Sequence, residues 1–85
     1  MRALEKEIDI LNAKYCTRSK NHLVIRKFYF GCQVCLTGKS YDKGLGTRYF
    51  GITNGFADPE ITLMNLLDCE KYGWIKSVIK RCERR

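Results

Sequence analysis

Hydrophobic and polar positions follow two different periods along this chain, and the changes of period predict its elements. Near the N-terminus, four apolar side chains are spaced four, three and four residues apart: Leu4, Ile8, Leu11 and Tyr15. This spacing places them on one face of a helix, so we expect a first helix over residues 3–14. Residues 17–21 include Thr, Ser and Asn, which hydrogen-bond their own backbone and predict a loop.

Residues 22–38 are rich in β-branched and aromatic side chains and predict the centre of a sheet. Over residues 22–30 apolar side chains occur at both odd and even positions, as in a strand that is covered on much of both faces. Gly31 interrupts this run, and a glycine within a strand pattern marks a bulge or a bend. The chain therefore forms either one long bent strand to Leu36 or two strands that turn near Gly31.

Turn residues then separate the first strands from a last one. Residues 38–46 contain three glycines together with Lys, Ser and Asp, which is the composition of tight turns. We expect the last strand over residues 47–53. The dipeptide Asn54-Gly55 ends the sheet.

Two more helices are expected after the sheet. Asp58 is a favourable N-cap, and Pro59 and Glu60 suit the first helical turn, so the second helix runs from here to about Lys71. It is the most apolar helix, and we expect it to be the main cover of the sheet. Gly73 is a C-cap residue, and beyond it apolar side chains recur at helical spacing with cations on the other side. A strand over residues 74–81 is the alternative and fits the period less well.

This order of elements predicts a single small α+β domain over residues 1–85. Its parts are a helix, an antiparallel β-sheet of three strands and two further helices, with the helices packed on one sheet face. The length of 85 residues supports one core, and 45% hydrophobic with 29% charged residues is typical of a folded domain. We expect the chain, which starts at Met1, to be a complete small gene product. The second sheet face is then left open to a partner.

Charge is distributed unevenly around the net value of +7. Residues 14–48 hold eight Lys and Arg residues and one acid, residues 49–70 hold four acids and no Lys or Arg, and residues 71–85 are again basic. The sheet and the C-terminal helix are therefore expected to be basic, with an acidic helix between them. No apolar run is long enough to span a bilayer, and the N-terminus lacks a signal peptide, which predicts a cytoplasmic protein with reduced cysteines.

Among the five cysteines, one pair has the spacing of a metal site. Cys32 and Cys35 could hold a zinc ion if Cys16 and His22, the one histidine, completed a set of four. If residues 32–35 form a strand, however, the two thiols point to opposite faces and cannot share a metal. We therefore expect packing cysteines and no cofactor, and a zinc-stapled interaction module is the weaker alternative.

Motifs for catalysis are incomplete. The tripeptide Gly38-Lys39-Ser40 matches the end of a phosphate-binding P-loop, but Gln33 stands where that motif needs glycine and no helix is expected after the serine. A thioredoxin-type thiol pair needs a following helix, which is also not expected. A serine hydrolase would depend on His22 as the one available base. These observations predict that the protein is not an enzyme.

Interleaved cations and rings are the remaining signal. Residues 26–30 and 48–50 place Arg or Lys next to Phe and Tyr, a combination that single-stranded nucleic-acid binders use for phosphate attraction and base stacking. We therefore expect a small non-enzymatic protein whose basic sheet and C-terminal helix bind nucleic acid or a nucleoprotein complex. The candidate contact residues are Arg26, Lys27, Lys39, Lys43, Arg48, Lys76, Lys80 and Arg81 for phosphate, with Tyr29, Tyr41 and Tyr49 for stacking or hydrogen bonding. In the opposite interpretation the rings form the core and the charge serves solubility.

A second class of function stays open. A short chain without a catalytic constellation also suits a protein-directed inhibitor or adaptor, for example a phage or mobile-element product that blocks a host nuclease or a CRISPR-type defence complex. Its interface would then centre on an aromatic hot spot such as Tyr72 or Trp74. The two hypotheses differ in salt dependence, because binding through phosphate contacts weakens steeply as salt rises.

Overall fold

The computed structural model describes residues 1–38 and 49–83, and they form the α+β domain that the sequence predicts. Within these residues there are three helices and three strands, in the order α1 (Arg2–Tyr15), β1 (Asn21–Phe28), β2 (Gly31–Gly38), β3 (Phe50–Gly51), α2 (Pro59–Lys71) and α3 (Trp74–Glu83). The strands form one antiparallel sheet in the order β1-β2-β3. No helix in the described part of the chain has both the length and the apolar character needed to cross a membrane.

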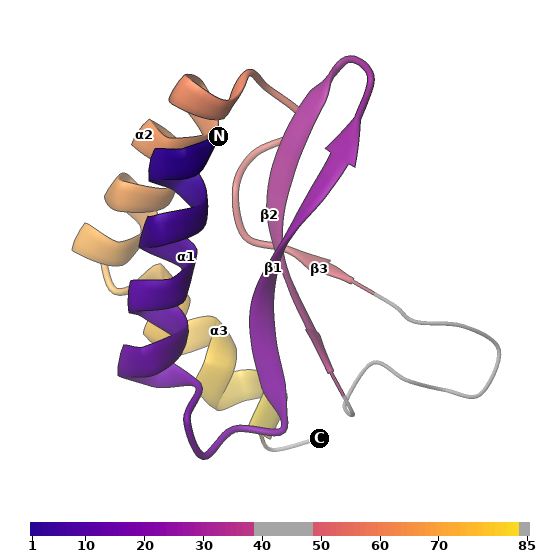
Figure 1. Cartoon of the computed structure of the whole chain (residues 1–85). Coiled ribbons are helices and arrows are strands. Elements are labelled where there is room, and N and C mark those ends of the chain that lie inside the picture. The colour runs from indigo at the N-terminus through magenta and orange to yellow at the C-terminus, as the bar shows by residue number, and fades with distance from the viewer. Residues whose placement is uncertain (39–48, 84–85) are drawn as a thin grey trace, which may run out of the picture.

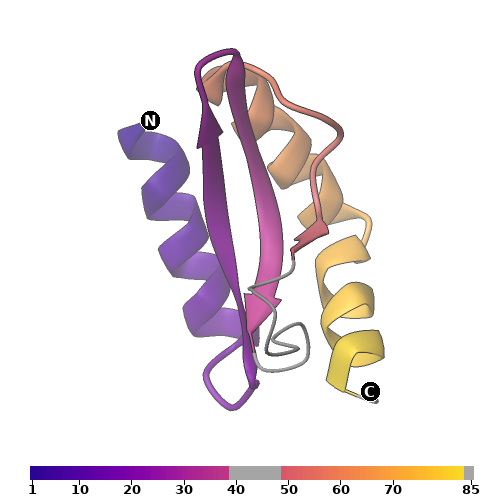
Figure 2. The same ribbon diagram turned by 90° about the vertical axis from the view of Figure 1, so that its right-hand side faces the viewer.

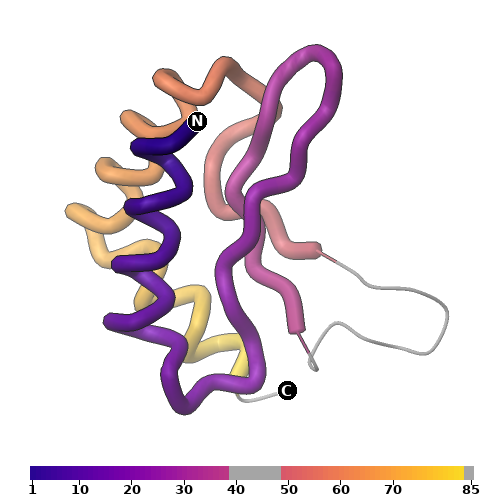
Figure 3. Tube along the Cα trace, in the orientation of Figure 1, coloured from indigo at the N-terminus to yellow at the C-terminus, as the bar shows by residue number. Residues whose placement is uncertain are grey.

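The helices form one layer against one face of the sheet (Figure 1). After a quarter turn the strands lie in front of this layer, so the second face of the sheet is toward the viewer (Figure 2). Helices α1 and α2 run in the same direction (Figure 3), and Lys14 and Tyr15 both donate hydrogen bonds to the Glu70 carboxylate. The bond from Lys14 is the main reason that the pKa of Glu70 is lowered, and the same bond raises the pKa of Lys14. The C-terminal ends of α1 and α2 are thus held together by charge.

The core lies between the sheet and the helices and follows from strand alternation. Residues that pair across β1 and β2 share a face, so Leu23 lies beside Leu36 and Ile25 beside Val34 on the side of the helices. They pack against buried side chains of each helix: Leu4, Ile8 and Leu11 of α1, Leu66 of α2, and Ile75, Val78, Ile79 and Cys82 of α3. Each fully buried aliphatic side chain contributes roughly 1.5–3 kcal/mol to stability. Sheet and helices therefore share one core.

The alternatives left open at Gly31 are resolved in favour of two strands. β1 and β2 pair over eight residues, and the last pair is Phe28 with Gly31. Tyr29 and Phe30 alone form the turn. The chain is therefore a tight hairpin here, and the single bent strand is wrong.

Gly31 is required at this turn for conformation and for space. Its φ angle is 146°, in the region that side chains rarely adopt. A Cβ at this position would also lie 2.8 Å from the backbone nitrogen of Ala57. The approach is this close because Cys32 and Ala57 exchange two backbone hydrogen bonds, of 2.9 and 3.1 Å. Gly31 thus allows the hairpin to pack against the segment that leads into α2.

The last strand is shorter than expected. β3 is limited to Phe50–Gly51, against the expected residues 47–53, of which 47 and 48 lie outside the described residues. The next two amides, of Ile52 and Thr53, both donate to the Val34 carbonyl, so the regular ladder ends there. The β-branched residues Ile52 and Thr53 therefore predicted strand at positions where the ladder of backbone hydrogen bonds has already become irregular.

The expectation that α2 is the main cover of the sheet is met only in part, because α1 contacts β1 as extensively as α2 contacts β2. α2 begins after Asp58 as expected, although the Asp58 side chain makes no capping hydrogen bond. It buries Thr62 and Leu66, whereas its large apolar side chains Ile61, Met64 and Leu67 are exposed. They are exposed because the apolar residues of α2 are spread around the helix instead of along one face. Helices α1 and α3 each bury more side chains than α2, and the strand alternative for residues 74–81 is wrong.

Asn12 of α1 pairs with the outer edge of β1. Its side-chain amide donates to the Leu23 carbonyl at 3.0 Å and accepts from the Leu23 N–H at 2.7 Å. The amide thus makes the two bonds that a neighbouring strand would make at this point. It attaches α1 to the sheet and occupies backbone groups that would otherwise favour pairing with another chain.

We expect Asn12→Ala to lower the free energy of unfolding by roughly 1–3 kcal/mol, because two backbone groups of Leu23 lose their partner. Alanine is the better helix former, so the loss would come from these bonds. Urea denaturation followed by circular dichroism measures the effect. The control is Asp9→Ala, an exposed position on the same helix. Equal stability of the two variants would contradict this role of Asn12.

Candidate nucleic-acid interface

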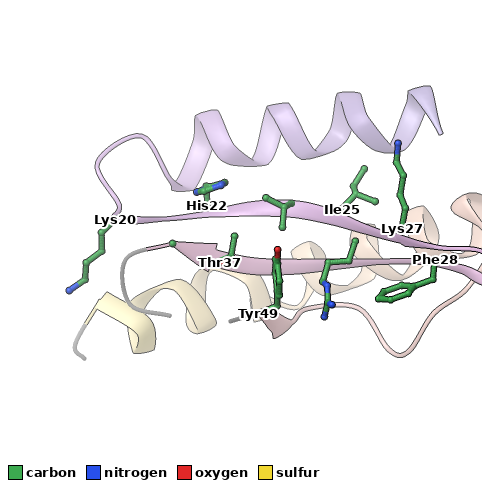
Figure 4. Close-up of a pocket in the computed structure, with 10 residues that line it drawn as sticks. Lys20, His22, Ile25, Lys27, Phe28, Thr37 and Tyr49 are labelled. Carbon is green, nitrogen blue, oxygen red and sulfur yellow. The ribbon is translucent and has the colours of Figure 1, made fainter. Parts of the chain in front are cut away.

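The face of the sheet away from the helices carries an open, basic hollow of about 860 Å³ (Figure 4). On β1 the outward-facing side chains alternate with those of the core, which places Arg26 and Phe28 on this face. The described residues that line the hollow are Lys20, His22, Val24, Ile25, Arg26, Lys27, Phe28, Thr37, Gly38 and Tyr49. None of these lining residues is acidic, so the described part of the hollow attracts anions.

Arg26 is the central side chain of this face. Its guanidinium carbon lies 4.2 Å from the ring centroid of Tyr49 and 5.2 Å from that of Phe28. Phe28 follows two residues later on the same strand, and Tyr49 comes from the residue before β3. Cation–π contacts of this kind contribute about 0.5–2 kcal/mol each. The guanidinium is therefore held between two rings on the same face of the sheet, one from edge strand β1 and one from the residue before edge strand β3.

Four rings gather at the tip of the β1–β2 hairpin: Phe28, Tyr29, Phe30 and Phe56, called the tip cluster below. The ring centroid of Phe28 is 4.4 Å from that of Phe56 and 5.5 Å from that of Phe30, and Tyr29 lies 5.0 Å from Phe30. All four side chains are exposed, and Tyr29 is 99% exposed. Because Phe28 also contacts Arg26, the tip cluster and the basic hollow form one continuous surface.

The hairpin turn explains why these rings lie outside the core. The strands pair up to the last possible residues, so Tyr29 and Phe30 project beyond the sheet. Phe56 is brought to them by the backbone hydrogen bonds between Cys32 and Ala57. Exposed apolar side chains gathered in one place are typical of a binding surface. Phe56 was not predicted as a site residue, because no local pattern reveals a contact that depends on a distant backbone pair.

The structure brings together part of the predicted contact set. Arg26 and Tyr49 are in contact, and Tyr29 lies at the hairpin tip. Lys27 also lines the hollow, but its Nζ lies 3.7 Å from the Glu5 carboxylate of α1. The alternation of β1 and this ion pair both turn Lys27 toward α1, so it lies at the border of the hollow and not beside Arg26 on the outer face (Figure 4).

The remaining predicted contacts are elsewhere. Lys76, Lys80 and Arg81 are on α3, which belongs to the helical layer behind the sheet, so the basic helix does not extend the sheet surface (Figure 2). Lys39, Tyr41, Lys43 and Arg48 lie outside the described residues. Phe50, the neighbour of Tyr49, packs against the core and not on the outer face.

A second hollow, of about 420 Å³, lies where the end of α2 meets the chain after β3. It is lined by Gly51, Ile52, Thr53, Asn54, Asn65, Asp68, Cys69, Tyr72 and Trp74. Tyr72 is 79% exposed, whereas Trp74 is half-buried against the core. The Lys71 ammonium lies 5.8 Å from the Tyr72 ring and the Arg81 guanidinium 5.7 Å from the Trp74 ring. The two aromatic residues predicted for a protein interface therefore share one site with cations and polar side chains.

The four residues of the alternative zinc set are not brought together. Cys32 lies toward the helices, where its thiol is 3.6 Å from the Thr62 hydroxyl, and Cys35 lies on the opposite sheet face near Arg26. Cys16 is buried after α1, and His22 is exposed on the outer face. In the described ranges no three metal-binding side chains are close enough to hold one ion.

Three of the five cysteine thiols have a raised pKa. Burial is the main cause that raises the pKa of Cys16, Cys35 and Cys69. A raised pKa keeps a thiol protonated at neutral pH, and the protonated form is a poor nucleophile and a poor metal ligand. These cysteines fit the expectation of packing residues.

Comparison with protein-family models, with curated proteins and with solved structures finds no significant match for this chain. A function must therefore be inferred from the chemistry of the two surfaces. Their common feature is aromatic rings beside cations.

We expect zinc to leave the protein unchanged, because the candidate ligands lie on different faces of the sheet. Thermal unfolding with equimolar Zn²⁺, and again after treatment with a chelator, should give the same Tm. A stoichiometric rise in Tm that is lost in both Cys32→Ser and His22→Ala would show that the ligands do meet.

Proposed function

We propose that the protein binds single-stranded nucleic acid on the outer face of the sheet. The observation that supports this most strongly is the row of rings that Arg26 joins, from Tyr49 through Phe28 to the tip cluster. Proteins that bind single strands combine a positive groove with aromatic side chains, and each base stacked on such a ring contributes about 1–3 kcal/mol. Arg26 would attract phosphate and also offer its planar guanidinium to a base.

Exposed rings favour single strands over duplexes. A base in a duplex is stacked on its neighbours, so its faces are not available to a protein ring. The rings of the tip cluster project beyond the sheet, where an unpaired base could reach them, and Tyr29 is almost completely exposed. No described element of the outer face has the form of a helix that could enter a major groove.

The charges around the hollow would hold the backbone. Lys20, Arg26 and Lys27 line it with His22, and none of its described lining is acidic. Because Lys27 is turned toward α1, two phosphate contacts, by Lys20 and Arg26, predict a slope of roughly −1.4 for the logarithm of the binding constant against the logarithm of salt concentration. Contacts of this kind do not read sequence, so binding on this face is expected to be general.

We expect Arg26→Ala to weaken binding of a labelled oligouridine or oligothymidine by about tenfold or more, because it removes a phosphate contact and separates the two groups of rings. Arg26→Lys keeps the charge and loses the planar group, so its affinity should lie between that of the unchanged protein and that of Arg26→Ala. Fluorescence anisotropy over a salt series measures both effects.

Lys6→Ala is the matched control for Arg26→Ala. It removes one positive charge from an exposed position on α1, in the helical layer. If it weakens binding as much as Arg26→Ala does, net charge alone accounts for the affinity and the proposed surface is wrong.

Tyr29→Ala tests the tip cluster. It should weaken binding of the same oligonucleotides, and an unchanged Tm would show that the fold is intact.

The α3 cations require a separate test. Lys76 and Lys80 are exposed on a helix behind the sheet, so we expect reversal of both to Glu to reduce affinity less than Arg26→Ala does, through long-range attraction alone. The Tm should not fall, because neither side chain is part of the core. A larger loss than for Arg26→Ala would move the binding surface to α3.

The apolar side chains of α2 favour a second candidate, a protein-directed inhibitor or adaptor. Ile61, Met64 and Leu67 are exposed on one helix, and Met64 is 66% exposed. Hydrophobic side chains of this size on a helix surface are suited to a protein partner. This candidate predicts no oligonucleotide binding at low salt and an association with a protein target that Met64→Glu abolishes and Arg26→Ala does not.

A further inference from the structure

We infer that the hollow beside Trp74 is a nucleobase pocket that prefers guanine, an inference that rests on the proposed function and names a selective subsite for it. The hollow of about 420 Å³ lies within the size range of small-molecule sites. It offers rings for stacking, side chains for hydrogen bonds and cations at its border. These are the three kinds of contact that a nucleotide needs.

Polar side chains in this pocket are available to a ligand. The backbone of the chain after β3 is already bonded within the protein, since the Thr53 carbonyl accepts from Gln33 at 3.0 Å and the Ile52 carbonyl from the Cys69 thiol at 3.6 Å. In contrast, the side chains of Asn54, Asn65 and Asp68 have no hydrogen-bond partner within the described residues. Three unpaired polar groups thus lie around one hollow with two aromatic rings.

The carboxylate gives the pocket its preference. Asp68 is the one acid among the lining residues, and an ionised carboxylate only accepts hydrogen bonds. Guanine is the one common base whose Watson–Crick edge presents two adjacent donors, the ring N1–H and the exocyclic amino group. Asn54 and Asn65 can donate to its carbonyl oxygen. Adenine, cytosine and uracil each place an acceptor beside their donor, which the carboxylate would repel.

The charges at the border favour a nucleotide over a basic side chain of a partner protein. An arginine side chain also offers paired donors to a carboxylate. Lys71 and Arg81, however, already lie over the Tyr72 and Trp74 rings, at 5.8 and 5.7 Å. Two positive charges thus lie on rings that line a pocket with one acid, a balance that disfavours a cation and favours phosphate.

The pocket is close enough to the outer face to share one strand of nucleic acid. Gly51 lines the pocket and pairs with Cys35 of β2. The Cys35 side chain lies on the outer face of the sheet, near Arg26. Tyr49 is two residues from Gly51 along extended chain, a separation of about 7 Å. A strand stacked on Tyr49 could therefore place a neighbouring base in the pocket.

Trp74 provides the measurement, because it is the only tryptophan in the chain. Its indole N–H resonance can be followed by NMR during titration with GMP, AMP, CMP and UMP. We expect GMP to bind about tenfold or more tightly than the others, the discrimination typical of one bidentate base contact. Asp68→Asn should reduce this preference to about twofold or less, because the amide replaces one acceptor with a donor. Glu60→Gln removes the same charge from an exposed position outside the pocket and should preserve it.

The outcomes separate this inference from the proposed function. Equal affinity for the four nucleotides, or a GMP preference that survives Asp68→Asn, overturns the guanine pocket, and oligouridine binding to the outer face is then unaffected. GMP binding that depends on Asp68 without any oligonucleotide binding would support the pocket and overturn the proposed function. An Asp68-dependent shift of the Trp74 resonance by N-acetylarginine amide, and not by GMP, would overturn the inference in favour of a protein side chain.

Discussion

The register of the β1–β2 hairpin is the constraint on which the rest of the structure depends. Side chains alternate between the two faces of a sheet, so a slip of one residue would expose Leu23 and Ile25 and turn Arg26 toward the helices. At the turn, Gly31 fixes the register because a side chain there would meet the backbone of Ala57. At the other end, the paired hydrogen bonds of Asn12 hold Leu23 to α1. The hairpin is thus held at two places, by the backbone of Ala57 at the turn and by Asn12 of α1 near its other end.

This register separates stability from binding. The inner face supplies the aliphatic core, and the outer face carries Arg26 and the rings that contact it. The tip cluster places four aromatic side chains in contact with solvent. Such a surface would favour self-association in a protein of low charge, whereas a net charge of +7 opposes it. The same charge attracts the nucleic acid that we propose as the ligand.

The two hollows differ in the kind of recognition they support. The outer face offers rings and cations, the groups that would suit any single strand. The pocket beside Trp74 adds unpaired amides and a carboxylate, the groups that would distinguish one base edge from another. In the proposed function, the first surface provides affinity and the second provides selectivity. The two hollows lie close together along the chain. Tyr49, which lines the first, directly precedes β3, and Gly51, which lines the second, belongs to β3.

The sequence by itself determined the class of the fold and most of its elements. Helical spacing located α1 and α3, and Asp58, Pro59 and Glu60 located the start of α2. Strand alternation also indicated that Cys32 and Cys35 lie on opposite faces, and the interleaved cations and rings indicated Arg26, Tyr29 and Tyr49 as a group. These are local properties, since they depend on the conformation of a few neighbouring residues.

Only the tertiary structure decided where the surfaces lie. The two-strand hairpin depends on the backbone of Ala57, and the contact of Phe56 with Phe28 depends on the same distant pair. Apolar residues lie all around α2, and packing decided that Leu66 is buried and Met64 exposed. The position of α3 behind the sheet separates its cations from Arg26. The hollow at Trp74 is formed by residues more than twenty positions apart, from Gly51 to Trp74. Contacts between distant segments leave no periodic pattern in the chain, and for that reason only the folded molecule reveals them.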